Sequence, residues 1–239
     1  CLPYLLVKRP EWDKFAGAVY TIGVDTLMPS MKTLQLGSIH QYKENFSKPY
    51  DIKYEGSDKQ FHFCHQTTYG MSERLVGAIV GVHGDNKGVI MPPKIAPFQF
   101  VIIPILAKNK AEMVLDEARK LQEELRSFGY TVKLDDRDDR PGSKHYDWEI
   151  KGVPVRVEIG PRDIEKGTVV FKRRDVNDKI FVDRSDLKEE AEKVLEEVQS
   201  ELLKRAREIL DIGVKMVDSL DDGIKLLDSD WDGIIKTHW

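Results

Sequence analysis

Residues 66–97, with the sequence QTTYGMSERLVGAIVGVHGDNKGVIMPPKIAP, decide how the rest of the chain is interpreted. A helical pattern runs through the middle of this stretch, with apolar side chains at Leu75, Val76, Ile79, Val80 and Val82. The turn-rich residues 84–88 (GDNKG) end the predicted helix. The apolar residues 89–91 then predict a short strand, which the prolines at positions 92 and 93 stop.

A charged pair, Glu73 and Arg74, stands in the first turn of this predicted helix. The start of a helix offers free N–H groups and partial positive charge, so an arginine placed there can help to hold a polyanion. An exposed arginine paired with a nearby acid explains the same residues. Spacing alone does not separate the two interpretations, because short motifs specify sites weakly.

The composition is that of an ordinary globular protein of one or two domains, with 239 residues, 41% of them hydrophobic and 33% charged. No run of uncharged apolar residues is long enough for a membrane span. No basic region precedes the apolar N-terminal residues, so no signal peptide is predicted. We expect a cytoplasmic protein. Because the chain begins CLPYLL without an initiator methionine, we also expect it to be part of a longer protein.

The two cysteines, Cys1 and Cys64, form no disulfide framework, which fits a reducing compartment. His62 and His65 flank Cys64, but successive side chains of a strand point to opposite faces. We therefore predict no metal site among these residues.

Charge is divided unevenly along the chain. Residues 183–239 hold 16 acidic and 9 Lys or Arg residues, a balance of −7. The remaining residues, 1–182, hold 28 basic and 25 acidic groups, a balance of +3. A weakly positive body suits a protein that meets phosphates while reading specific features, and it differs from a non-specific nucleic-acid coat.

Three regions follow from the pattern of elements. Residues 1–97 show short β-rich runs at 20–24, 32–36, 52–54 and 59–65 before the predicted helix, which together indicate an antiparallel sheet with the helix on one face. Residues 98–182 alternate strand and helix, which indicates an α/β layer with a mixed sheet. Its first helix begins with a capping-box pattern at Asn109 and Glu112. Residues 183–239 begin with one long amphipathic helix over 185–210 and then show turns at 221–223 and 230–233.

Residues 70–74 (GMSER), followed by LVGA, resemble motif 3 of class II aminoacyl-tRNA synthetases. The runs 83–88 (HGDNKG) and 91–97 (MPPKIAP) are more specific and resemble prolyl-tRNA synthetases of the archaeal and eukaryotic type. The resemblance implies a fold in which 1–97 is the C-terminal part of an α+β catalytic core with an antiparallel sheet. Residues 98–182 would then be an α/β anticodon-binding domain, and 183–239 a long helix and the start of a C-terminal domain.

The family's reaction consumes ATP and proline, forms prolyl-adenylate and transfers the prolyl group to tRNA(Pro). By this resemblance Arg74 is the catalytic residue, since it binds the ATP phosphates together with Mg²⁺, and the protein is expected to be a homodimer. Catalysis of this kind consists of positioning and charge neutralisation. Zinc belongs to a C-terminal domain of some family members, and the cysteines that would bind it do not occur in this chain.

The resemblance also assigns binding residues in the first region. Gln35, Ser38 and Ser72 would contact ATP, with residues 35–40 forming a loop over the adenylate. Proline would lie against His40, Phe15 and Tyr69. A glutamine amide can read an adenine edge, and aromatic walls suit a small apolar substrate. Family members usually have Thr-Ser-His at 38–40, where this chain has Ser-Ile-His. For each aromatic residue, plain core packing is the alternative.

In the second region the segments that resemble the family's anticodon-binding domain are 135–144 (DDRDDRPGSK), 148–154 (WEIKGVP) and 158–163 (EIGPRD). Proline anticodons carry two guanines, and Arg, Lys and Glu side chains suit guanine edges on a single-stranded loop. The resemblance therefore implies anticodon contacts for Arg140, Lys144, Glu149 and Lys151. A surface ion-pair network explains the same alternating charges. Residues 172–174 (KRR) would add phosphate contacts or form a solvated turn.

Motifs 1 and 2 of the class II enzymes, which supply the dimer interface and a second phosphate-binding arginine, are not found in the sequence. Two alternatives to the ligase therefore stay open. One is a non-catalytic tRNA-binding module derived from a synthetase. The other is a different class II synthetase with the same anticodon domain, for threonine or glycine.

Overall fold

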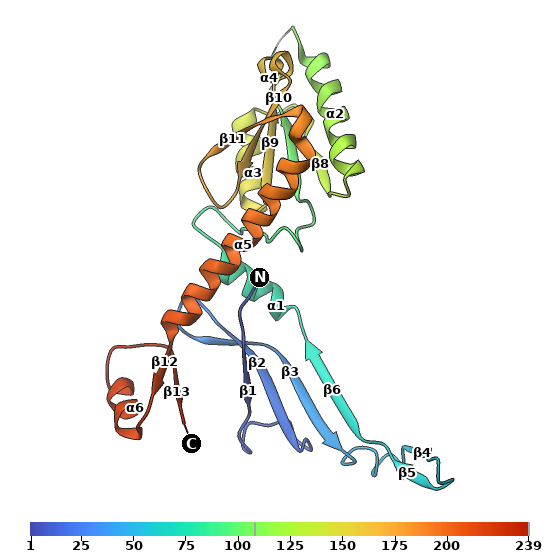
Figure 1. The fold of residues 1–239 in the computed structure, drawn as a ribbon, viewed down its shortest axis with the longest axis vertical. Coiled ribbons are helices and arrows are strands. Elements are labelled where there is room, and N and C mark those ends of the chain that lie inside the picture. The colour runs from blue at the N-terminus through green and yellow to red at the C-terminus, as the bar shows by residue number, and fades with distance from the viewer. Residues whose placement is uncertain (108, 239) are drawn as a thin grey trace. The chain divides into compact units, whose positions relative to one another are not determined.

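A computed structural model describes residues 1–107 and 109–238, and its chain divides into two units. One unit contains His83–Ala206 together with Cys1. The other contains Leu2–Val82 and the chain from Arg207 onward. The predicted limits at 97 and 182 divide the chain differently and stay predictions. The two units are described separately (Figure 1).

The unit that begins at Leu2 is built on a four-stranded antiparallel sheet in the order β1-β2-β3-β6. This confirms an antiparallel sheet, but of the four predicted β-rich runs only 20–24 and 32–36 belong to it. A separate hairpin pairs β4 with β5. The bounds are β1 Leu5–Lys8, β2 Tyr20–Leu27, β3 Thr33–Lys43, β4 Lys53–Glu55, β5 Phe61–Phe63 and β6 Gln66–Met71. The predicted helix follows directly as α1, Arg74–His83.

Two local predictions in this part of the sequence were wrong. Residues 35–40, expected as a loop, lie within β3, where both neighbouring strands supply backbone partners. Residues 89–91, expected as a strand, pair with no strand in the part of the chain that the structure describes. The N–H of Met91 instead donates to the carbonyl of Gly152, 3.0 Å away, so one isolated bond replaces a ladder.

The His83–Ala206 unit is a three-layer α/β structure around a five-stranded mixed sheet, as the sequence predicts. The order is β11-β10-β9-β7-β8, with β7 parallel to both neighbours and the β9-β10-β11 side antiparallel. The strands are β7 Phe100–Pro104, β8 Val132–Leu134, β9 Val155–Ile159, β10 Thr168–Arg173 and β11 Lys179–Asp183. The helices are α2 Ala111–Ser127, α3 Pro141–Ile150 and α4 Pro161–Lys166, followed by a short 3₁₀ turn (η1, Arg184–Asp186) and by α5 Leu187–Gly213.

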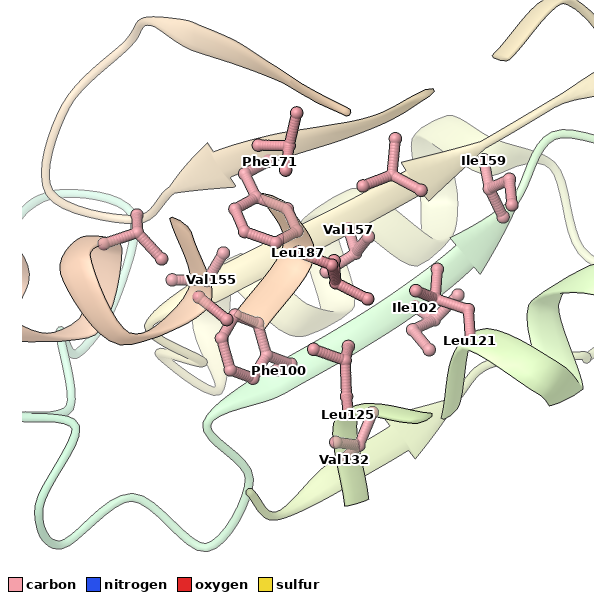
Figure 2. Close-up of a cluster of buried hydrophobic side chains, with 14 of the residues drawn as sticks. Phe100, Ile102, Leu121, Leu125, Val132, Val155, Val157, Ile159, Phe171 and Leu187 are labelled. Carbon is pink, nitrogen blue, oxygen red and sulfur yellow. The ribbon is translucent and has the colours of Figure 1, made fainter. Parts of the chain in front are cut away.

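Alternation along the strands separates two apolar cores. On one face, Phe100, Ile102 and Phe171 pack against α2 and the first turns of α5 (Figure 2). On the other face, Val101 and Ile103 pack against Trp148 of α3. Burial on both faces explains why β7 reads as a continuous apolar run. The sheet therefore supports α3, which carries two of the predicted anticodon residues, Lys144 and Glu149, and is flanked by the other two.

Helix limits show two further departures from the sequence predictions. Helix α2 begins at Ala111 with Lys110 as its N-cap and no side-chain cap hydrogen bond, so the predicted capping box is wrong. The predicted turn at 221–223 lies inside α6, Leu220–Leu227, because Ser219 caps that helix by accepting a hydrogen bond from the N–H of Asp222. Helix α6 connects two parallel strands, β12 Val214–Val217 and β13 Ile234–Thr237.

Candidate functional sites

A bulge in β3 brings three of the predicted binding residues onto one face of the antiparallel sheet. Gln35, Ser38 and His40 would not share a face in a regular strand, because side chains alternate. The register with β2 shifts between Val24 and Asp25, which leaves Leu36 without a partner there. The extra residue returns Gln35 to the face that Ser38 and His40 occupy.

His40 is fixed on this face through both ring nitrogens. Its Nδ1 lies 2.9 Å from the hydroxyl of Thr21, and its Nε2 lies 2.9 Å from the hydroxyl of Ser38. Thr21 also accepts a hydrogen bond of 3.0 Å from the backbone N–H of Phe15. The rings of Phe15 and His40 are 4.9 Å apart. The structure thus brings Phe15, Ser38 and His40 together, as the predicted site requires.

Gln35 belongs to a polar cluster that the sequence reading missed. Arg9 donates to Asp25, 2.7 Å away, and to the side-chain oxygen of Gln35, 3.3 Å away. The Arg9 guanidinium lies directly over Gly23, where any Cβ would collide with it. Arg9 is far from Gln35 in sequence and matches no quoted motif, so only the strand pairing reveals this neighbour.

Tyr69 lies on a different face from His40. It pairs with Ile39 across β3 and β6, while Thr68 is the partner of His40. Alternation then directs the Tyr69 side chain to the opposite side of the sheet, where it is 78% exposed. The structure does not bring Tyr69 together with Phe15 and His40, and its contact with proline stays a prediction.

Ser72 and Arg74 lie where β6 passes into α1. The Ser72 hydroxyl accepts a 3.4 Å hydrogen bond from the N–H of Arg74. The N–H groups of Leu75 and Val76 donate to the carbonyls of Ser72 and Glu73, respectively. The first turn therefore uses these N–H groups itself, and the exposed Arg74 side chain is the group available to an anion.

The four predicted anticodon residues have different surroundings. Arg140 is exposed at the N-cap of α3. Lys144 is 1% exposed, and its ammonium donates to the backbone carbonyl of Asp135, 3.1 Å away. Lys151 lies over the Trp148 ring, with its Nζ 4.5 Å from the centroid. A guanine contact by Lys144 stays a prediction, and it would require this interior hydrogen bond to break.

Glu149 faces an open groove of about 580 Å³ on the His83–Ala206 unit. The ammonium of Lys87 donates to Glu149 Oε1 at 3.2 Å. Other residues lining the groove include Tyr146 and His145 from α3, Arg156 from β9 and Lys172 from β10. Lys87, Tyr146 and Arg156 were not predicted as site residues. The groove is thus a cationic surface that also holds one carboxylate and one exposed aromatic ring.

Burial and neighbouring charges shift the pKa values of ionisable groups in and beside the groove. Burial alone raises the pKa of Glu158, but the hydrogen bond from Lys179 and the charge of Arg156 outweigh it and hold that pKa below its usual value. Burial lowers the pKa of Lys172, and the charge of Arg156 adds to this effect. Burial and Arg156 also lower the pKa of His145, which favours its neutral form.

The other two residues of the predicted basic run are engaged in ion pairs. Arg173 pairs with Asp175 and Glu197 at 2.7 and 2.8 Å. Arg174 binds both carboxylate oxygens of Asp85, at 2.6 and 2.8 Å. The Arg174 hydrogen bond is the main cause that lowers the pKa of Asp85 to about 2. Of this run, Lys172 is the residue that lines the groove.

Over residues 1–107 and 109–238 the structure contains no group of three or more His, Cys, Asp or Glu side chains placed to hold a metal ion. Among the helices of the same described residues, none is long and apolar enough to cross a membrane.

Comparison with known proteins identifies the class first. Residues 99–197 match the family described as "Anticodon binding domain", and this match covers the mixed sheet, α3 and the groove residues of these elements, but not Lys87. The His83–Ala206 unit therefore contains an anticodon-binding domain.

The curated relatives define the family more narrowly. The chain is 49% identical over 219 residues to a proline–tRNA ligase of Thermococcus kodakarensis, an alignment covering 92% of this chain and 46% of the relative. It is 51% identical to the enzyme of that name from Pyrococcus horikoshii and 42% identical to that from Methanothermobacter thermautotrophicus, each over 92% of this chain. The chain belongs to the prolyl-tRNA synthetase family. It spans about half the length of the curated relatives it matches.

Proposed function

We propose that this chain forms part of a proline–tRNA ligase. In this proposal the antiparallel sheet with α1 is part of the class II catalytic core, and the groove of the mixed-sheet domain binds the anticodon of tRNA(Pro). The observation that carries the catalytic half is the shared sheet face of Gln35, Ser38 and His40, on which Phe15 closes over His40. The protein would act in the cytoplasm as a homodimer.

The reaction has two steps. The proline carboxylate attacks the α-phosphate of ATP, which forms prolyl-adenylate and releases pyrophosphate. A hydroxyl at the 3′ end of the tRNA then attacks the prolyl carbonyl and releases AMP. Neither step needs a covalent bond to a protein side chain, so the residues act by binding, orientation and charge neutralisation.

Each residue of the sheet face has a role that suits these steps. The ring of Phe15 and the imidazole of His40 would form an apolar wall for the proline ring, with Thr21 and Ser38 holding the imidazole. The Gln35 amide would read adenine, for which it would exchange its present bonds to Arg9 and the Gly37 carbonyl. The hydroxyl of Ser72 would contact the nucleotide beside Arg74.

Charge neutralisation falls to Arg74, whose guanidinium would bind the ATP phosphates. Mg²⁺ accompanies ATP in such reactions and screens its phosphates. Oxygens of substrate phosphates and water commonly supply most of the ligands of such an ion.

The test is proline-dependent exchange of pyrophosphate into ATP, measured on the full-length protein. We expect exchange with proline and none with threonine or glycine. Arg74→Ala should reduce it at least a hundredfold, the size of effect that one transition-state contact supplies. Arg119→Ala, an exposed arginine on α2, is the matched control and should leave the rate unchanged.

Other outcomes decide between the alternatives. Exchange with threonine or glycine in place of proline would assign the chain to another class II synthetase. Binding of tRNA(Pro) without any exchange would indicate a non-catalytic tRNA-binding module. Equal exchange by the Arg74→Ala variant would remove Arg74 from the phosphate site.

A further inference from the structure

The Lys87–Glu149 pair lies at the groove of the anticodon-binding domain and joins two distant parts of the sequence. Lys87 belongs to the turn after α1, and Glu149 to the last turn of α3. The Lys87 side chain is 54% exposed and that of Glu149 24%, so both remain accessible from the groove. An exposed pair of this kind adds little to stability. Its position is therefore of more interest than its strength.

Lys87 is held in this position by its own turn. Its N–H donates to Asp85 Oδ1 at 2.8 Å, and the two oxygens of Asp85 are bound by Arg174. Arg174 also donates to the backbone carbonyls of Gly88 and Glu149, at 3.2 and 2.9 Å. One buried guanidinium thus ties the Lys87 turn to the backbone of Glu149. Arg174 therefore holds the backbone of the Lys87 turn close to that of Glu149, independently of the ion pair between the two side chains.

The pair offers one hydrogen-bond donor and two acceptors. The Lys87 ammonium is a donor, and next to it stand two acceptors, Glu149 Oε1 and Oε2. The Watson–Crick edge of guanine has the complementary groups, with the O6 acceptor followed by the N1–H and N2–H₂ donors. Adenine would place its amino group against the ammonium and its N1 acceptor against the carboxylate. Uracil would set its O2 acceptor against Glu149.

We propose that Lys87 and Glu149 together read the Watson–Crick edge of one anticodon guanine, with Lys87 donating to O6 and Glu149 accepting from N1–H and N2–H₂. The base would stack on Tyr146, which lies three residues before Glu149 on the same side of α3 and is 71% exposed. Arg156 and Lys172, on the strands beside this groove, would bind the neighbouring phosphates. This inference rests on the proposed binding of tRNA(Pro) by the groove.

The experiment measures binding of the full-length protein to stem-loop RNAs with a UGG anticodon loop. Each guanine is replaced in turn by inosine, which lacks the 2-amino group, or by adenine. At the position read by the pair, the unmodified protein should prefer guanine to adenine by at least tenfold, with inosine between them. Lys87→Met should weaken guanine binding about tenfold and reduce the guanine-to-adenine ratio by a similar factor. Lys87→Arg should preserve the ratio, because it keeps a donor.

Two further variants separate base reading from other roles. Tyr146→Leu should weaken all the RNAs alike, because stacking tolerates every base. Lys120→Met, an exposed lysine on α2 paired with Glu117, is the matched control and should change nothing.

If Lys87→Met weakens all the RNAs equally and the guanine-to-adenine ratio survives, Lys87 acts only through its charge on phosphates, and the proposal is overturned. If the unmodified protein prefers guanine at neither position, the groove does not read the anticodon. In that case the proposed function of this domain fails together with the inference.

Discussion

The ammonium of Lys144 donates a hydrogen bond to the backbone carbonyl of Asp135, 3.1 Å away, inside the anticodon-binding domain. Both residues belong to one stretch of charged sequence, yet Lys144 and the Asp135 side chain are almost completely buried. Trp148, from the same helix as Lys144, donates to Asp135 Oδ2 at 2.7 Å. Two hydrogen bonds from α3 therefore end on Asp135, which directly follows β8.

Lys144→Met should lower the free energy of unfolding by about 1–2 kcal/mol, because it leaves a buried carbonyl without its donor. Lys151→Met, at the exposed end of the same helix, is the control and should cost only about 0.5 kcal/mol, because it removes only a surface cation–π contact with Trp148. Urea unfolding at pH 7 measures both. We expect Lys144→Met to leave the guanine-to-adenine ratio of RNA binding unchanged. A variant of normal stability that loses this ratio would instead support direct contact between Lys144 and the anticodon.

Asp135 should make stability depend on pH in the acid range. Burial alone raises the pKa of this carboxyl, but hydrogen bonds from Arg137 and Trp148 outweigh it and bring the pKa to about 2. The folded-state pKa is thus below the unfolded value of about 3.9, so the contribution is complete above pH 4 and is lost as pH falls toward 2. Asp135→Asn should cost about 2 kcal/mol at pH 7.

The measurement is urea unfolding of both proteins at several pH values from 7 down to 3. The two curves should converge as the pH falls, because the native carboxylate loses its advantage while the amide does not titrate. A difference that stays constant over this range would show that the Asp135 charge does not contribute and that only shape matters.

Gly152 should be intolerant of any side chain. Its φ is +72°, and an added Cβ would collide with the Val89 carbonyl, which belongs to the segment carrying the Lys87 turn. Gly152→Ala should therefore lower the free energy of unfolding by about 3 kcal/mol or more. Gly129→Ala is the control, since Gly129 also has a positive φ (+93°) but open space around it. It should cost only about 1–2 kcal/mol in thermal or urea unfolding. Equal losses would mean that the close approach to Val89 is unimportant.

Much of the fold could be predicted from periodicity and turn residues. The continuous apolar run of β7, the stripes of α2 and α5 and the helix of α1 all gave correct elements. The bulge at Leu36 could not be predicted, because an extra residue in a strand leaves no mark in the alternation that short strands show. It is nevertheless the feature that places Gln35 beside Ser38 and His40.

The candidate sites likewise contain residues that could be predicted from the sequence and residues that could not. Glu149 was predicted and lines the groove, but its partner Lys87 lies 62 positions away and only the folded chain brings the two together. The burial of Lys144 could not be predicted from the sequence either. A lysine in an acidic and basic stretch is expected at the surface, and nothing in its neighbours indicates that a carbonyl of the interior receives its ammonium.

Thr21→Val tests whether the orientation of His40 matters for proline. The Thr21 hydroxyl is buried and contacts both His40 Nδ1 and the N–H of Phe15, so valine keeps the shape and removes both bonds. If His40 and Phe15 form the wall for proline, freeing them should raise KM for proline about tenfold, which corresponds to about 1.4 kcal/mol. The KM for ATP should change little.

Thr26→Val is the matched control, because Thr26 is a buried residue of the same strand whose hydroxyl donates to the Pro3 carbonyl, away from His40. Both variants should lose about 1–2 kcal/mol of stability, but only Thr21→Val should alter KM for proline. If the two variants affect KM equally, the hydrogen bonds of Thr21 serve the sheet alone and His40 needs no such support.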